Sequence, residues 1–276
     1  MTTASNTLPS AGRFGSGQSV RRLEDDGLLA GKGRYTDDVQ VEGQLHVAFL
    51  RSPYPHARIG AIDTSTAETM PGVVKVITGA GPVAANVRPI PGVAGFRRAD
   101  GQPGVTPPRR VLAHETARFV GGPVIAEVAE GVQPARDVAA AVFVEFEDLP
   151  MVVDPLRAVA PGAPVLYDAA PDNFSAEMRH GDAAATQKAF EAAAHLVTLD
   201  ITNQRLAAVT LEPRSVQAEV DKASGRTTVR MSTQMPSSVR DTLCNDVLGI
   251  PRDQVRVVVG DVGGGFGMKT GIYPED

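Results

Sequence analysis

The stretch VRVVVGDVGGGFGMK, residues 255–269, joins a run of β-branched residues directly to a cluster of glycines. The run at 255–259 predicts a strand, because valine suits the pleated surface of a sheet. Glycine has no Cβ, so consecutive N–H groups in residues 263–267 can close on a phosphate or another polyanionic group. The sequence ends at Asp276, soon after this loop. We therefore expect a ligand site of which this sequence contains only a part.

The glycine cluster departs from both common phosphate-binding motifs. A dinucleotide fingerprint needs a third glycine where Met268 stands. A P-loop needs glycine directly before lysine, whereas Met268 separates Gly267 from Lys269. Phe266 is also unusual in a plain phosphate cradle. A phosphate-binding NTPase is therefore disfavoured, and a turn that only redirects the chain remains the structural alternative.

Composition excludes several classes of protein. The 276 residues are 42% hydrophobic and 21% charged, as in a soluble globular protein, and suggest two domains or one domain and part of another. A net charge of −5 gives no global attraction for nucleic acid. No apolar run reaches the roughly 20 residues of a membrane span. The sequence has a single cysteine, Cys244, which excludes an internal disulfide and a metal site built from cysteines. The cytoplasm is the expected location.

The first half reads as alternating strands and helices. Strands are expected at 45–51, 73–78, 124–128 and 143–147, with helices at 63–70 and 134–142. Strand–helix–strand units of this length favour parallel pairing through a right-handed crossover. Between them lies the segment 79–110, rich in glycine, proline and arginine. We expect a solvated arm there, in preference to an anion or partner site.

The second half follows an Ala/Pro/Gly connector that ends near Pro171. Its expected elements are a helix capped by Asp182, a strand at 196–201, a hairpin at 215–220 and 227–232, and a helix at 238–249. A capping box of Ser238 and Asp241 is predicted to open that last helix, and Cys244 beside its apolar stripe is predicted to be a buried structural thiol.

The sequence shows neither a histidine metal site nor a Ser/His/Asp catalytic triad. The five histidines show no metal-binding spacing and are expected to be surface or packing residues: His46, His56, His114, His180 and His195. Of these, His56 is the most distinctive, because it lies in a proline-rich turn. We find no Ser/His/Asp arrangement.

Eight segments in chain order carry a pattern that none of them carries alone. They are RRLED at 21–25, GKGRYTDD at 31–38, FLRSPYPHARI at 49–59, RFVGGPV at 118–124, EFEDLP at 145–150, LEPR at 211–214, STQ at 232–234 and GGGFG at 263–267. The ordered set resembles the large, molybdopterin-binding subunit of the xanthine dehydrogenase, aldehyde oxidase and carbon monoxide dehydrogenase family. It spans nearly the whole chain from residue 20.

The resemblance implies a mixed α+β and α/β fold in two parts. A disordered tail at 1–19 precedes an α/β hammerhead domain at 20–155. A linker at 156–171 leads to the truncated start of a molybdenum-cofactor-binding α+β domain at 172–276. Expressed alone, this second part is expected to be partly molten, because its hairpin and the 255–259 strand would lack neighbours.

The resemblance also implies the site residues. Gln234 would lie beside the molybdenum, with its amide donating toward an oxo ligand, while Gly264, Gly265, Phe266 and Gly267 would line the metal centre and the pterin. A Gln amide can donate a hydrogen bond without competing as a strong ligand. The alternative for Gln234 is a hairpin-end residue that bonds the local backbone.

Two features leave the chemistry incomplete. Ser237 follows Pro236, where many relatives have histidine. The glutamate that acts as general base is expected beyond Asp276, so no catalytic residue is assigned, and Glu212 is expected to be structural. No residue is assigned as a protein ligand to the metal.

The resulting hypothesis is the N-terminal part of a molybdenum hydroxylase catalytic subunit, either half of a split subunit or a truncated product. It implies oxidative hydroxylation of an aldehyde, an N-heterocycle or carbon monoxide, with the cofactor in its cytosine dinucleotide form. Iron–sulfur and flavin subunits and a C-terminal large-subunit half are the implied partners. The alternative is a non-catalytic assembly module or an inactive fragment.

Overall fold

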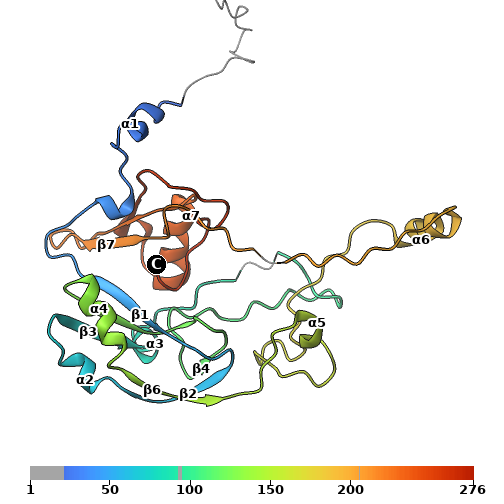
Figure 1. Cartoon of the computed structure of the whole chain (residues 1–276), viewed down its shortest axis with the longest axis horizontal. Coiled ribbons are helices and arrows are strands. Elements are labelled where there is room, and N and C mark those ends of the chain that lie inside the picture. The colour runs from blue at the N-terminus through green and yellow to red at the C-terminus, as the bar shows by residue number, and fades with distance from the viewer. Residues whose placement is uncertain (1–21, 93–94, 205) are drawn as a thin grey trace, which may run out of the picture.

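The computed structural model describes residues 22–92, 95–204 and 206–276 (Figure 1). The tail predicted at 1–19 lies outside these residues. Helices and strands are both present in quantity, which confirms the mixed fold class. None of the described helices combines the length and the apolar character that crossing a membrane requires.

The first half forms two three-stranded sheets. One has the order β1-β5-β3 and the other the order β4-β2-β6, and all their pairings are antiparallel. The strands are β1 (His46–Arg51), β2 (Ala57–Asp63), β3 (Val73–Thr78), β4 (Thr116–Ala117), β5 (Pro123–Ala129) and β6 (Phe143–Asp148). The helices of this half are α1 (Asp25–Leu29), α2 (Ser65–Glu68), α3 (Ala80–Ala84) and α4 (Val132–Ala139), with a 3-10 turn η1 (Thr36–Asp38).

The predicted parallel pairing is wrong. β1 and β3 run in the same direction, but β5 lies between them and is antiparallel to both. β6 is not part of this sheet: it pairs with β2, a strand that the sequence analysis did not predict. The hydrophobic core of this half includes Val124, Ile125 and Val138, so strand β5 and helix α4 both contribute to it.

The segment 79–110 is only partly a solvated arm. Ile90 is buried in the core of the second half, and it bridges to Arg109. The backbone N–H of Arg88 donates to the Val247 carbonyl at 2.9 Å, and its guanidinium donates to the Asn245 carbonyl at 2.5 Å. The segment therefore joins the two halves where it passes the second core.

The second half contains a third sheet with the order β7-β8-β9. β7 (Val216–Val220) and β8 (Thr227–Met231) form the predicted antiparallel hairpin, and β9 (Val255–Val258) pairs parallel to β8. Helix α7 (Pro236–Asp241) and the π-helix η2 (Thr242–Leu248) share a core with β8 and β9. The expectation that these strands lack neighbours is wrong, since Val229 and Val255 are buried in that core.

The helix after β8 begins earlier than predicted. Met235 is its N-cap and Pro236 its first residue, so the capping box of Ser238 and Asp241 does not form. Proline suits this position because it lacks the N–H that would be unpaired there. The end at Gly249 is confirmed by its left-handed φ of 68°. Cys244 is fully buried, as predicted, and burial raises the pKa of its thiol.

Residues 155–204 add two helices outside the sheets. α5 (Pro155–Ala158) begins at the N-cap Asp154, and α6 (Ala183–Ala192) begins at the predicted cap, Asp182. The strand predicted at 196–201 is wrong, because no neighbouring strand pairs with it in the described part of the chain. The short 3-10 turn η3 (Arg252–Gln254) precedes β9.

Candidate functional site

The predicted site residues come together at one edge of the third sheet. Gln234 follows β8 and the glycine loop, residues 263–267, follows β9. Since β8 and β9 are parallel neighbours, their carboxyl ends meet at the same edge. The topology therefore brings Gln234 against the loop.

Gln234 is packed closely on Gly265. A Cβ at position 265 would lie 2.4 Å from Cδ of Gln234, so a larger residue would displace the amide. Its Oε1 accepts a hydrogen bond of 3.1 Å from the Gly267 N–H. No acceptor contacts its Nε2 among the residues the structure describes. The side chain thus bonds the loop backbone through its oxygen, and because Gln234 is exposed its amide hydrogens are open to solvent.

Phe266 occupies an unusual conformation at the tip of this loop. Its φ of 48° lies in the left-handed region, which costs a non-glycine residue roughly 1–2 kcal/mol. The residue is 78% exposed. Gly264, two residues before it, and Gly267, directly after it, have φ of 102° and 84°. The loop accepts this strain while the ring buries little of itself against the described chain.

A buried ion pair fixes the loop to the rest of the sheet, and sequence reasoning missed it. Lys269 is completely buried, and its Nζ donates to Glu212 Oε2 at 2.9 Å and to Ser232 Oγ at 2.7 Å. Glu212 Oε2 also accepts from Ser232 Oγ at 2.6 Å and from the Gly263 N–H at 2.7 Å. Nζ donates its third hydrogen to the Glu212 carbonyl at 2.9 Å, so the ammonium is fully engaged and is not free to bind a phosphate.

The pKa of Glu212 reports this environment. Burial acts to raise the pKa of the carboxyl, but hydrogen bonds from Ser232, Lys269 and Gly263 outweigh it and lower the pKa. The carboxylate is therefore the stable form, and its contacts with Lys269, Ser232 and Gly263 are compatible with the structural role predicted for Glu212.

The same lysine positions Gln234 through its backbone. The carbonyl of Lys269 accepts hydrogen bonds from the Gln234 N–H at 2.8 Å and from Thr233 Oγ1 at 3.0 Å. The ion pair, the loop and the residue after β8 thus form one connected unit.

The start of the loop is also clamped to the N-terminal part of the chain. Asp261 N–H donates to the Arg34 carbonyl at 2.9 Å, and the Arg34 N–H donates to Asp261 Oδ2 at 2.7 Å. A Cβ at Gly260 would lie 2.3 Å from that carbonyl, which is backbone and cannot turn aside.

Gly260→Ala is therefore expected to lower the free energy of unfolding by about 1–3 kcal/mol, the usual cost of overpacking. Chemical denaturation followed by circular dichroism measures the change. Gly271→Ala is the matched control, because no atom lies within 4 Å of a Cβ there. Equal stability of the two variants would contradict the close approach.

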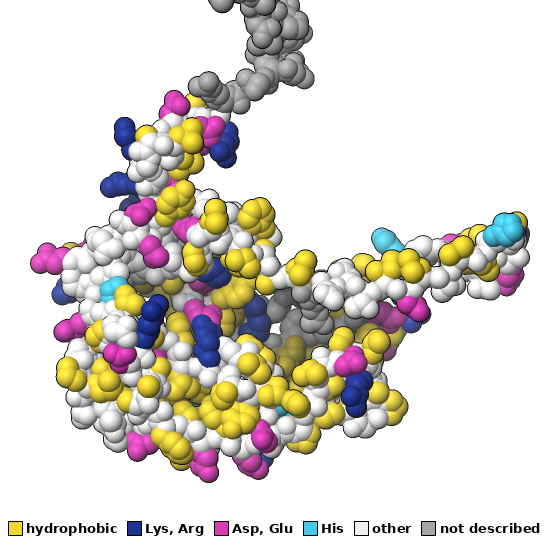
Figure 2. All heavy atoms as spheres, viewed as in Figure 1, with side chains coloured by type: hydrophobic (Ala, Val, Ile, Leu, Met, Phe, Trp, Pro, Cys, Tyr) yellow, Lys and Arg dark blue, Asp and Glu magenta, His cyan; other side chains and the backbone are white. Residues whose placement is uncertain are grey.

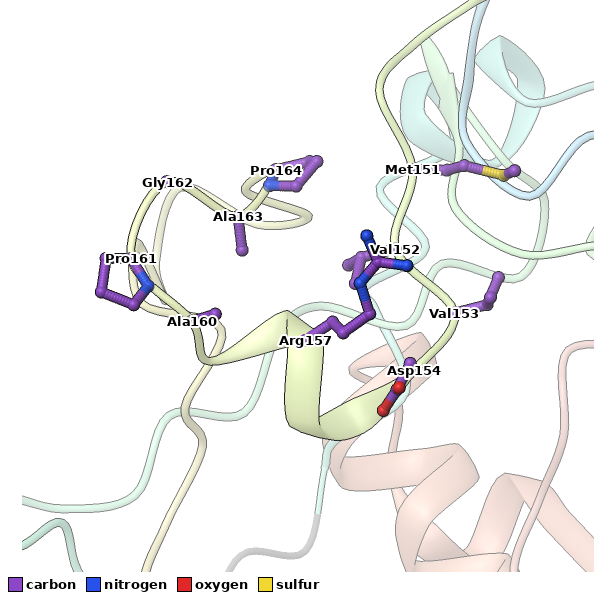
Figure 3. A pocket seen from close by; sticks show the side chains of 10 residues that line it. All are labelled: Met151, Val152, Val153, Asp154, Arg157, Ala160, Pro161, Gly162, Ala163 and Pro164. Carbon is purple, nitrogen blue, oxygen red and sulfur yellow. The ribbon is translucent and has the colours of Figure 1, made fainter.

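A pocket away from the glycine loop is lined by few chemically reactive side chains. It has a volume of about 400 Å³ and lies in the connector, lined by residues 151–154, 157 and 160–164 (Figure 3). Its one carboxylate, Asp154, accepts a hydrogen bond of 2.8 Å from the Leu156 N–H and so caps α5.

The most distinctive histidine, His56, is bonded to the backbone, since its Nδ1 lies 2.7 Å from the Pro150 carbonyl. Within the described residues no three His, Cys, Asp or Glu side chains gather as metal ligands.

Two family models match the chain. The aldehyde oxidase and xanthine dehydrogenase a/b hammerhead domain matches residues 30–150, and the molybdopterin cofactor-binding domain matches residues 166–276. The second match contains Gln234, the glycine loop and both members of the buried ion pair.

Similar proteins include two curated large subunits. The large subunit of nicotine 6-hydroxylase from Paenarthrobacter nicotinovorans is 38% identical over 94% of this chain, which covers 31% of that protein. The carbon monoxide dehydrogenase large chain of Afipia carboxidovorans is 35% identical over 94% of this chain and 32% of its own length. The chain thus spans about a third of the length of these relatives.

A solved structure agrees with the sequence comparisons. Quinoline 2-oxidoreductase from Pseudomonas putida 86 matches with a TM-score of 0.80 and 35% identity, over 94% of this chain and 32% of that one.

Proposed function

The chain belongs to the family of molybdopterin-binding large subunits of xanthine dehydrogenase, aldehyde oxidase and carbon monoxide dehydrogenase, and from this premise we propose that it holds one side of the molybdenum cofactor. The observation that carries the proposal is the packing of Gln234 on the glycine loop, with the two hydrogens of its Nε2 pointing to no described acceptor.

The residues fit such a group. We propose Gln234, Gly264, Gly265, Phe266 and Gly267 as the cofactor-binding residues. The glycines leave out the side chains that would otherwise fill the space beside Gln234. Phe266, in a strained and exposed conformation, presents an aromatic ring that can cover a bound group. When bound, the molybdenum cofactor supplies the redox chemistry of an oxidative hydroxylation.

Each of these residues has a role that follows from its position. Gln234 donates from Nε2 and is held by its own Oε1 on the Gly267 N–H. Phe266 excludes water from the group that it covers. The Lys269–Glu212 pair ties the end of the loop to the residues that precede β7 and so holds the loop at the edge of the sheet.

The complete enzyme is part of the same proposal. It would hydroxylate an aldehyde, an N-heterocycle or carbon monoxide, with the general-base glutamate beyond Asp276 and the cofactor in its cytosine dinucleotide form. Electrons would leave through iron–sulfur and flavin subunits in the cytoplasm, and a C-terminal large-subunit half would complete the site. We propose the domain division at 20–155, a linker at 156–171, and 172–276. The family matches and the one-third coverage of the relatives support this reading.

The test is the molybdenum content per mole of chain, after gentle purification from the native host with its bound partners. Near-stoichiometric molybdenum is expected. Gly265→Val would push the Gln234 amide aside, and we expect it to lower the metal content at least about tenfold, as disturbed outer contacts of metal sites do. Gln254→Ala, an exposed glutamine on η3, is the control.

A second function has one observation in its favour. The hammerhead half has a hydrophobic core of its own, made of residues outside the candidate cofactor site. We propose under this second function that it folds without any cofactor and docks partner subunits. Partners that co-purify with a wild-type chain free of molybdenum would reject the cofactor proposal and leave a non-catalytic assembly module.

A further inference from the structure

A second pocket, of about 440 Å³, lies against the third sheet and shares no lining residue with the candidate cofactor site. The segment 34–40, which carries η1, forms one wall of this pocket, and β8 with the residue that leads out of β9 forms the other. The lining residues are Arg34, Tyr35, Thr36, Asp38, Val39, Gln40, Arg230 and Gly260.

Both walls are held together by contacts within this chain. Gln217 on β7 donates from Nε2 to the Val39 carbonyl at 3.2 Å and to Gln44 Oε1 at 2.8 Å. At the other end, Arg34 and Asp261 exchange two hydrogen bonds through the backbone of Arg34. In Figure 1 the segment with η1 passes beside β7. The walls of the pocket are therefore a property of this chain.

Arg230 brings a positive charge to the pocket that its neighbours do not balance. Val229 and Met231, on either side along β8, are buried in the core, so alternation turns Arg230 to the outer face of the sheet. Its cross-strand neighbours are Gln217 and Val258, which carry no charge. Its Nε is buried and has no hydrogen-bond partner among the described residues.

Arg34 adds a second guanidinium group from the opposite wall. The ion pairs of the described residues include neither Arg34 nor Arg230. The one carboxylate of the lining, Asp38, accepts a hydrogen bond of 2.9 Å from the Tyr35 N–H, which holds it in the turn. The two guanidinium groups thus share a pocket in which the described chain supplies them with no negatively charged partner.

The surface as a whole does not attract anions. The net charge is −5, and on the face drawn in Figure 2 basic and acidic side chains lie interspersed. Anion binding by this chain therefore requires a site at which several donors converge on one group.

We infer that this pocket binds a phosphate group, with the guanidinium groups of Arg34 and Arg230 as its charged donors. The planar fork of arginine matches the paired oxygens of a phosphate. A tetrahedral oxyanion has oxygens in more directions than a carboxylate, so donors on two walls can share it. The inference does not depend on the molybdenum cofactor, because the pocket is lined by other residues.

Titration calorimetry of the full chain tests the inference, with inorganic phosphate as the probe and sodium chloride of equal ionic strength as the reference. We expect phosphate to bind at one site. Arg230→Gln and Arg34→Gln should each weaken the binding at least about tenfold, since each removes a charge-assisted hydrogen bond. Arg226→Gln is the matched control, because Arg226 is exposed just before β8 and does not line the pocket. It should bind phosphate like the wild type.

Hydrogen exchange locates the binding site. The Asp261 N–H donates to the Arg34 carbonyl, so an anion that anchors Arg34 should protect this amide. With phosphate at about ten times its Kd, we expect the amide to exchange about tenfold more slowly, as linkage between binding and local opening requires. The amides of α6, which lies outside the pocket, should not change.

Adenosine monophosphate distinguishes two sources of the phosphate group. Tighter binding of this ester than of inorganic phosphate would assign the pocket to a phosphate ester, and equal or weaker binding would assign it to the free ion. Absence of binding by both probes, equal binding by the wild type and Arg230→Gln, or an equal response to chloride would overturn the inference. So would binding by the isolated chain that is missing from the form purified from the native host with its partners, since other polypeptide would then fill the pocket.

Discussion

Replacing Lys269 by methionine is expected to lower the free energy of unfolding by about 3–5 kcal/mol, the usual cost of removing one partner of a buried ion pair. Methionine has nearly the length of the lysine stem, so the packing volume is kept and the ammonium is lost. The carboxylate of Glu212, whose side chain is only 13% exposed, would then lose its cation, and Ser232 Oγ would lose a hydrogen bond. Chemical denaturation of the full chain measures the difference.

Three further variants separate the charge effect from a loss of packing: Lys222→Met, Glu212→Gln, and Glu212→Gln combined with Lys269→Met. Lys222→Met, in the exposed turn of the hairpin, should change stability by no more than about 0.5 kcal/mol. Glu212→Gln combined with Lys269→Met should recover part of the loss, because no unpaired charge is left in the interior. If the double variant were as unstable as the sum of the two single variants, the two side chains would not interact as the structure indicates.

The Lys269 cluster shows what a sequence reading can miss. In the sequence, Lys269 belongs to a motif that departs from a P-loop, Glu212 is predicted to be structural, and no pattern links the two residues. Glu212 precedes β7, which is antiparallel to β8, and Lys269 follows β9, which is parallel to β8. The two pairings together bring residues 57 positions apart to one edge of the sheet. Local spacing carries no signal of such a pairing. The glycine cluster itself was visible, because its conformational demands are local.

Strand pairing was the other weak point. The hairpin of β7 and β8 was predicted because the turn between its strands is short and local. The position of β5 between β1 and β3 depends on strands that are far apart in the chain. β2 follows a proline-rich turn and was not predicted as a strand. The strand predicted at 196–201 is wrong for the structure, although its alternation is real, because alternation predicts a buried face without showing what covers it.

Glu127 provides the second large effect, in the hammerhead half. It lies on β5, opposite Ala48 of β1 and Val76 of β3, and is completely buried. Neither carboxyl oxygen has a hydrogen-bond partner among the described residues. Burial disfavours the charged form and raises the pKa of Glu127 to about 7 from its ordinary value of 4.5.

This shift makes stability depend on pH. Between pH 4.5 and about 7 the folded protein keeps a proton on Glu127 that the unfolded chain releases, so stability falls as the pH rises through this window. The contribution is fully present below pH 4.5 and is lost above about pH 7. At 1.36 kcal/mol for each pKa unit, the loss amounts to about 3 kcal/mol.

Glu127→Gln is therefore expected to abolish this part of the pH dependence. Glutamine has nearly the same shape but no charge, so the variant should unfold with nearly the free energy of the wild type at pH 5. At pH 8 it should be more stable than the wild type by about 1–3 kcal/mol. Glu130→Gln, one residue beyond the same strand and exposed, is the matched control and should track the wild type at every pH. Denaturation curves at pH 5, 6, 7 and 8 decide the matter, since a stability difference that stays constant across them would mean that Glu127 is ionised in the folded protein. Because the other titrating groups are common to wild type and variant, the difference between their curves isolates this one buried carboxyl.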